Sequence, residues 1–154
     1  MPGTIDTRLV ELGFTLPDAP APAANYVPFV QTGNLVFISG QVSIGAEGKL
    51  AGRLGDGVDI PAGQAAARVC AINLIAQLKA ATGGDLDRVQ RVVKLTGFVN
   101  SAPTFYDHPQ VVNGASDLMA EVFGAKGAHA RAAVGVAALP LGVAVEVEGI
   151  FEIA

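Results

Sequence analysis

The stretch ARAAVGVAALPLGVAVEVEG, residues 130–149, contains two alternating runs separated by Leu-Pro-Leu-Gly. Side chains of a β-strand point alternately to opposite faces of the sheet. The first run therefore places Arg131 and small residues on one face and valines on the other. The second run places Glu146 and Glu148 opposite its valines. We expect two strands whose valine faces pack against helices, joined by a turn at the proline.

Hydrophobic periodicity and turn residues predict the elements that precede this stretch. A short helix ends at Gly13 and is followed by an extended tether rich in proline, because proline fixes φ and lacks an amide donor. Ser39-Gly40-Gln41 is expected to end the second strand, and Asp107 to cap the last helix. The expected elements are a helix at 5–12, a hairpin of strands at 26–31 and 35–38, a glycine-rich loop or weak strand pair at 43–57, a helix at 61–81, a strand at 89–99, a helix from 107 to 124, and strands at 130–138 and 143–153.

The order of these elements predicts an α+β fold, in which two helices pack against one mixed β-sheet. The chain has 154 residues, 51% of them hydrophobic and 16% charged, which excludes a disordered protein and indicates one globular domain. The net charge is −4 and basic residues are not clustered, so nucleic-acid binding is not favoured. Cys70 is the single cysteine, and neither a signal peptide nor an apolar run of membrane-spanning length is present. We therefore expect a soluble cytoplasmic protein.

Arg131 is the strongest candidate for a functional residue, and the pattern leaves two interpretations open. A tight hairpin about Pro140 would place Arg131 opposite Glu148 as a structural ion pair. Alternatively, the small residues beside Arg131 leave room for its guanidinium to bind a carboxylate bidentately, through two parallel hydrogen bonds. His108 and His129 lack the neighbouring ligands of a metal site, and no nucleotide-binding motif is present.

Four stretches of the chain, taken in order, resemble the RidA/YjgF family, whose members are also labelled translation-initiation inhibitor or L-PSP endoribonuclease-like. The stretch at 130–149 is the most specific of them, because Arg131, Leu139-Pro140 and Val145-Glu146 keep the family spacing. The four stretches are 26–41 (YVPFVQTGNLVFISGQ), 64–78, 93–99 (VKLTGFV) and 130–149.

The resemblance implies a chorismate-mutase-like fold of the bacillus type that assembles as a homotrimer around a central barrel. Small-molecule clefts would then lie between subunits, and the sheet face with small residues would meet a neighbouring subunit. The implied activity is hydrolysis of reactive enamines and imines, such as 2-aminoacrylate, to 2-oxo acids and ammonia. Residues 1–25 would form an N-terminal helix and tether of the extended variety of the family, and residues 26–154 the family domain.

Carried over residue by residue, the resemblance implies a site with five members. Arg131 would bind the substrate carboxylate, while Tyr26 and Ser39 would line the cleft. Glu146 would help to position the attacking water, and the backbone at Ala133 would face the imine nitrogen. Neither a metal nor an organic cofactor is implied, and the expected partners are a small carboxylate-bearing metabolite and two further copies of the chain, with no nucleic acid or membrane.

Two features depart from the family pattern. A cysteine that is frequent two residues after the arginine is Ala133 here, and the loops at 100–110 and before Pro61 differ from the short-form members. Both loops are expected to reshape the cleft. The alternative function is a trimer that binds or senses small carboxylates without turnover. Ribonuclease activity agrees less well with an acidic chain that lacks a basic groove.

Overall fold

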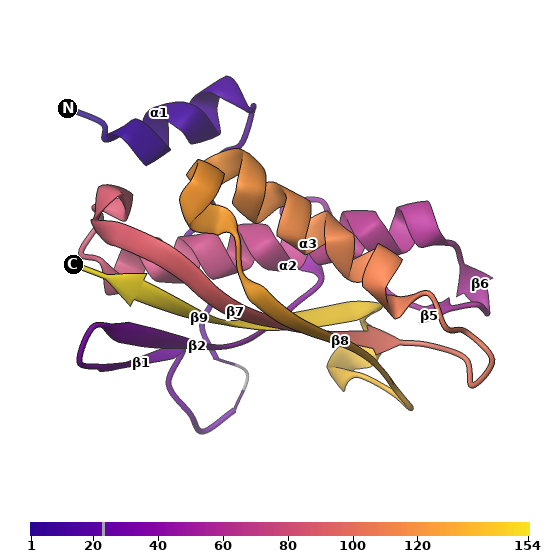
Figure 1. Ribbon diagram of the computed structural model, residues 1–154. Coiled ribbons are helices and arrows are strands. Elements are labelled where there is room, and N and C mark those ends of the chain that lie inside the picture. Colours follow the sequence, from indigo (N-terminus) through magenta and orange to yellow (C-terminus); the bar gives the residue numbers. More distant parts are fainter. Residues whose placement is uncertain (23) are drawn as a thin grey trace.

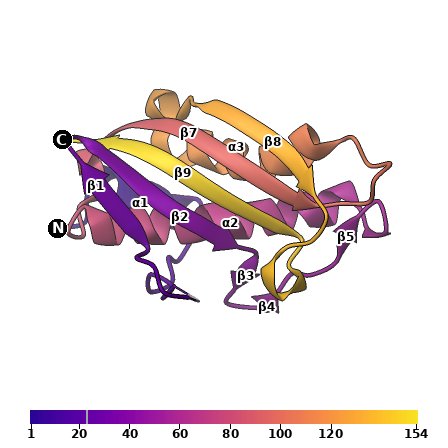
Figure 2. The same ribbon diagram turned by 90° about the horizontal axis from the view of Figure 1, so that it is seen from below.

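The computed structural model describes residues 1–22 and 24–154. Its centre is a five-stranded sheet of order β1-β2-β9-β7-β8. Helices α2 and α3 cover one face of this sheet and leave the other face open (Figures 1 and 2). The elements are α1 (Thr4–Glu11), β1 (Phe29–Thr32), β2 (Leu35–Val42), β3 (Ile44–Gly45), β4 (Gly48–Lys49), β5 (Arg53–Leu54), β6 (Gly57–Val58), α2 (Ile60–Ala81), β7 (Val89–Asn100), α3 (His108–Phe123), β8 (Ala130–Val136) and β9 (Val145–Ile153), with short 3₁₀ turns at Leu86–Arg88, Gly124–Gly127 and Pro140–Gly142.

The two long helices form where the periodicity predicted them. The Asp59 carboxylate accepts a hydrogen bond of 2.9 Å from the amide of Ala62 and so caps α2. The predicted apolar stripe of α3 is fully buried against α2 and the sheet. Asp107 does lie at the N-cap position of α3, but its side chain makes no capping hydrogen bond. Its ψ of 32° is not the extended conformation typical of a capping residue.

Strand β2 is longer than expected. Ser39-Gly40-Gln41 does not end it, because the strand continues to Val42. The pairing of β2 with β9 shifts between Ile38 and Gln41, which is a β-bulge at this sequence. A glycine within a strand signals such a bulge as readily as a strand end. Three further predictions agree with the structure: the hairpin of β1 and β2, the short strand pairs of the glycine-rich segment, and the lack of regular structure along 14–22. Residue 23 of the predicted tether lies outside the described residues.

The expected hairpin of the last two strands is wrong. Strand β8 pairs in parallel with β7, with Arg131 beside Leu95, whereas β9 runs antiparallel between β2 and β7. Arg131 and Glu148 therefore lie on strands that are not neighbours, and the ion pair between them does not form. Strand periodicity gives the two faces of each strand but not its neighbours in the sheet, and α3 carries the chain back parallel to β7.

The predicted faces are right for β9 and inverted for β8. Val145 and Val147 are buried under the helices, on the face opposite Glu146 and Glu148. On β8, however, Arg131 contacts α3, while Val134 is 43% exposed on the open side. The small residues of β8 are needed where α3 lies close to this edge strand, so they and not the valines face the helix.

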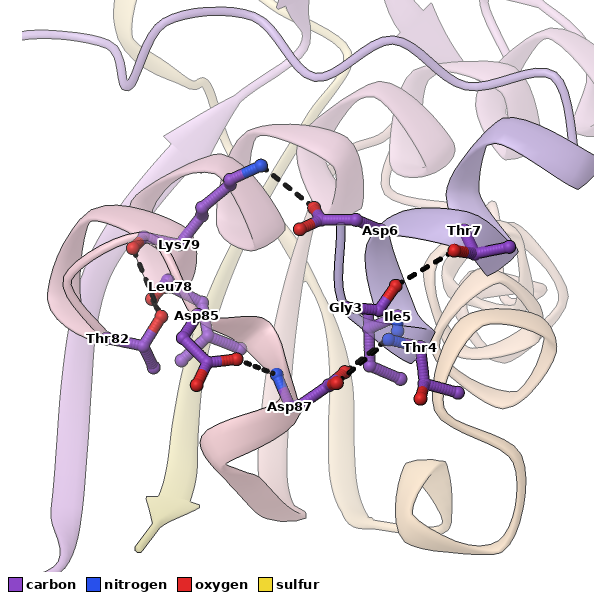
Figure 3. A network of polar contacts seen from close by, with 10 residues as sticks. All are labelled: Gly3, Thr4, Ile5, Asp6, Thr7, Leu78, Lys79, Thr82, Asp85 and Asp87. Carbon is purple, nitrogen blue, oxygen red and sulfur yellow. Dashed lines mark hydrogen bonds and ion pairs between the residues drawn. The ribbon is translucent and has the colours of Figure 1, made fainter. Parts of the chain in front are cut away.

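Helix α1 is fixed to the body of the protein by charged side chains. The Asp87 carboxylate accepts hydrogen bonds of 2.8 and 2.9 Å from the amides of Thr4 and Ile5, which no residue of the helix itself satisfies (Figure 3). These bonds lower the pKa of Asp87. Lys79 of α2 lies 2.8 Å from Asp6 in a second contact. Within the described residues, no helix combines the length and apolar character needed to cross a membrane.

Candidate functional site

A cavity of about 490 Å³ lies where the tether crosses the end of β2, beside β9 and α2. Two residues expected at the site, Tyr26 and Glu146, line it together. The lining residues are Pro20, Ala21, Pro22, Ala24, Tyr26, Pro28, Gly40, Gln41, Val42, Ile44, Asn73, Gln77, Pro140, Leu141 and Glu146. The cavity is therefore mostly apolar, with a few convergent polar groups, as small-molecule sites usually are.

Glu146 is the only acid that lines this cavity among the described residues. It is half-buried, and this burial raises the pKa of its carboxyl, with a further contribution from the nearby charge of Glu148. Its carboxylate lies against the backbone of β2, where a Cβ at Gly40 would be 2.6 Å from Glu146 Oε1. The missing side chain at Gly40 therefore leaves the space that the carboxylate occupies. A raised pKa suits a group that accepts and returns a proton near neutral pH.

Two buried polar residues of α2 line the same cavity and were not predicted. Asn73 donates to the carbonyls of Val42 and Ile44 at 3.2 and 3.0 Å, which fixes the chain after the bulge. Gln77 Nε2 donates to the Pro20 carbonyl at 2.5 Å and holds the tether against the helix. The available signal was the spacing of Asn73 and Gln77, two polar residues four positions apart within the apolar second half of the helix, because residues at this spacing share one face.

Ser39 supports the cavity from outside. Its hydroxyl donates to the Val27 carbonyl at 2.8 Å, and its amide donates to the Pro28 carbonyl at 2.9 Å. These bonds hold the segment that carries Tyr26 against β2. Ser39 is not among the lining residues, so in this chain it positions Tyr26 and does not itself face the cavity.

Arg131 lies at the opposite edge of the sheet, on β8, with its guanidinium against the first half of α3. Its Nη1 donates to Asn113 Oδ1 at 2.7 Å and to Ser116 Oγ at 3.2 Å, and its Nη2 donates to the Pro109 carbonyl at 3.3 Å. Within the described part of the chain, no carboxylate lies within 4 Å of it. A cation held by neutral acceptors is available to bind an anion.

A chain of hydrogen bonds behind Arg131 fixes its geometry. His129 Nδ1 lies 2.6 Å from the Gly127 carbonyl, which can only accept, so Nδ1 is protonated. In the neutral ring Nε2 is then an acceptor, and the Ser116 hydroxyl, 2.8 Å away, donates to it. Ser116 Oγ is thereby left to accept from Arg131. Neither Ser116 nor His129 was expected at the site.

The five expected site residues form two groups in one chain. Tyr26 and Glu146 share the cavity, with Ser39 behind them, whereas Arg131 and Ala133 lie on the helix-facing side of the edge strand β8. The methyl group of Ala133 packs against the core. The described residues contain no group of three or more His, Cys, Asp or Glu side chains placed to bind a metal ion.

The family model described as "YjgF/chorismate_mutase-like, putative endoribonuclease" matches residues 6–152. The chain belongs to the YjgF family. The resemblance noted in the sequence is confirmed, and the α+β arrangement of one mixed sheet and two helices is the YjgF/chorismate-mutase-like fold.

Three relatives illustrate the range of similarity within the YjgF family. Protein TCP17 of Trypanosoma cruzi is 50% identical over 155 residues, covering 98% of this chain and 95% of that protein. The structure of Atu1372 from Agrobacterium tumefaciens, a protein of unknown function, is 50% identical with a TM-score of 0.91, covering 97% and 92% of the two chains. Escherichia coli TdcF, solved with bound serine, is 26% identical with a TM-score of 0.63, covering 88% and 94%.

Proposed function

We propose that this YjgF-family protein hydrolyses small 2-imino acids and their enamine tautomers to 2-oxo acids and ammonia. The observation that carries the proposal is the Arg131 guanidinium, which α3 holds in place with neutral acceptors only. A planar fork of this kind matches a substrate carboxylate. The serine bound to the relative TdcF supports a ligand with both a carboxylate and a nitrogen on the same carbon.

Glu146 supplies the acid–base chemistry in this proposal. Water adds to the imine carbon, the resulting carbinolamine transfers a proton to its nitrogen, and ammonia leaves as the C=O bond forms. A carboxyl with a raised pKa accepts a proton from the attacking water and returns it to the leaving nitrogen. Imines react readily with water, so orientation of substrate and water accounts for most of the required rate gain.

The reacting groups belong to a cleft that two subunits complete. Arg131 and Glu146 lie on opposite sides of the sheet in one chain, so a single subunit does not bring them to one substrate. The open face of the sheet exposes the apolar side chains of Phe37, Val134 and Val30, which a neighbouring subunit would cover. We propose a homotrimer in which Arg131 of one subunit faces Tyr26 and Glu146 of the next.

The alternative function is binding of a small carboxylate without turnover, which the same Arg131 geometry and the bound serine of TdcF would also support. Cleavage of RNA, which the family description names, is less well supported. Among the described residues that line the Glu146 cavity there is no lysine or arginine to bind a phosphate backbone, and the net charge is −4.

The test is the release of 2-oxo acid and ammonia from 2-iminopropionate formed in situ by an amino-acid oxidase. The parent should accelerate release, while Arg131→Gln and Glu146→Gln should abolish the acceleration at unchanged oligomeric size. Arg91→Gln, which changes an exposed arginine on β7, is the matched control and should retain activity. No acceleration by the parent, combined with 2-oxobutyrate binding that needs Arg131, would reject the enzyme and favour the carboxylate-binding protein.

A further inference from the structure

The two loops that depart from the short-form pattern meet at one end of the sheet. Strand β5 and the segment after β7 lie side by side where β7 and β8 finish (Figure 1). The amide of Ala102 donates to the Leu54 carbonyl at 2.9 Å, and Arg53 Nη2 donates to the Ser101 carbonyl at 3.3 Å. Phe105 packs directly on Gly55. The two loops therefore build one structure that neither forms alone.

Between them lies a second cavity, of about 370 Å³, separate from the one that contains Glu146. Its polar side is formed by Arg53, Ser101 and His108, and its aromatic side by Phe105 and Tyr106. Tyr106 is 78% exposed, so its ring forms a free wall at the cavity mouth. The remaining lining residues are Ala102, Pro103, Gly135, Val136 and Ala137.

The charge of this cavity is positive. Arg53 is the only lysine, arginine or carboxylate among the described lining residues. The nearest counter-charge, Asp56, is 3.7 Å away from Nη1, and both side chains are exposed, so this pair is weak. Arg53 Nε is buried and has no hydrogen-bond partner within the described chain. The donors that a ligand can reach are Nη1 and Nη2, which have only the weak Asp56 pair and the Ser101 carbonyl as partners and so keep hydrogens free.

The floor of the cavity is a hydrogen-bonded pair. Ser101 Oγ lies 2.9 Å from His108 Nε2, and the His108 ring packs edge-on against Phe105. Gly135 of β8 faces this pair, and a Cβ there would contact His108 Nε2 and lie 2.6 Å from Ser101 Oγ. The missing side chain therefore lets the Ser101 hydroxyl and His108 ring lie beside β8, at the bottom of the cavity.

We propose that this cavity binds a small carboxylate with a flat body. The carboxylate accepts hydrogen bonds from the Arg53 guanidinium and from the Ser101 hydroxyl, and the flat body lies against the Tyr106 ring. In this arrangement His108 Nε2 carries the ring hydrogen and donates to Ser101 Oγ, which leaves the single hydroxyl hydrogen for the carboxylate. The site is independent of the proposed imine hydrolysis. Arg131 lies four residues before Gly135 on β8 and is bonded to α3, so it takes no part in this cavity.

Benzoate is the probe, and benzamide, which has nearly the same shape without the charge, is its control. In titrations followed by the backbone amide signals of Tyr106 and Gly135, benzoate should bind the parent at least about tenfold more tightly than benzamide, as a charged hydrogen bond implies. Arg53→Gln should weaken benzoate binding by about tenfold, as the loss of a charged hydrogen bond implies. Tyr106→Ala should weaken the binding of both probes. The matched control Arg91→Gln should leave both unchanged.

Three results would overturn the proposal. Equal affinity for the two probes would show that the charge is not recognised, and unchanged benzoate binding by Arg53→Gln would show that Arg53 is not the recognising group. Loss of the benzoate-induced shifts in Arg131→Gln but not in Arg53→Gln would assign the probe to the Arg131 site instead. Because Tyr106 is exposed, Tyr106→Ala should stay folded even where another variant does not, so the site stays testable.

Discussion

Replacing Gly114 by alanine tests how closely α3 approaches α2 and thereby how the Arg131 site is built. A Cβ at position 114 would collide with the carbonyl oxygen of Gln64 and lie 2.8 Å from the carbon of that carbonyl. Both are backbone atoms, so neither can rotate away. Gly114 is flanked by Asn113 and Ser116, the two α3 side chains that hold the guanidinium. A shift of α3 at this point would move both.

We expect Gly114→Ala to destabilise the protein, whereas helix propensity alone predicts that it stabilises. Alanine in place of glycine within a helix stabilises by about 1 kcal/mol. Forcing a methyl group into a closed contact costs about 1–3 kcal/mol, and a rigid backbone neighbour places this site at or above the upper end. We therefore expect Gly114→Ala to lower the free energy of unfolding by about 2 kcal/mol, which corresponds to a fall in Tm of about 4–8 °C.

Urea denaturation at a fixed subunit concentration measures this change, because assembly of the proposed trimer would make the midpoint depend on concentration. Gly63→Ala is the matched control in α2. The nearest atoms to a Cβ there are the side-chain tips of Leu54 and Val111, at 2.8 and 3.1 Å, which can adjust. Gly63→Ala should cost less than Gly114→Ala. A Gly114→Ala variant that is more stable than the parent would refute the close approach of the two helices.

Three further predictions concern the N-terminal helix and the two halves of the site. Asp87→Asn should raise the rate of amide hydrogen exchange in α1 at pH 7, because the amides of Thr4 and Ile5 lose a charged acceptor. In the parent, the protection of α1 from exchange should be lost as pH falls through the pKa of Asp87, which its hydrogen bonds lower from 3.8. Unchanged exchange in the variant would contradict this role of Asp87. Ser116→Ala should weaken 2-oxobutyrate binding by about 3–10-fold, measured by calorimetry, because Arg131 loses one hydrogen bond; an unaltered affinity would refute that positioning. Glu148→Gln should lower the pKa of Glu146 and move the acid limb of the pH–rate profile to lower pH, since Glu148 contributes to its raised value; a limb that stays in place would argue against Glu146 as the base.

The helices and the faces of β9 could be predicted from the sequence because they depend on local periodicity. The apolar spacing of α3 determines its buried side wherever the helix packs. The same reasoning failed for β8, where the valines face outwards and Arg131 and Gly135 face α3. At Gly135 the His108 and Ser101 side chains approach too closely for any side chain on β8, and this contact between distant segments leaves no periodic signal.

The candidate site was only partly predictable for a related reason. Tyr26 and Glu146 were placed in one cleft by family resemblance, and they do share a cavity. Gln77 and His129 act through hydrogen bonds to groups on other segments of the chain, to the Pro20 carbonyl of the tether and to the Ser116 hydroxyl of α3. No spacing rule connects residues of this kind. The separation of Arg131 from Glu146 likewise depends on strand order, which alternation does not contain.

Subunit complementation tests the central claim, that Arg131 and Glu146 act on one substrate across a subunit boundary. Arg131→Gln and Glu146→Gln proteins, each inactive alone, would be mixed after reversible dissociation and assayed for release of 2-oxo acid from 2-iminopropionate. Random reassembly supplies both parent residues to about one cleft in four, so we predict about one quarter of the parent rate. Mixed assemblies that stay as inactive as the separate variants would contradict a site shared between subunits.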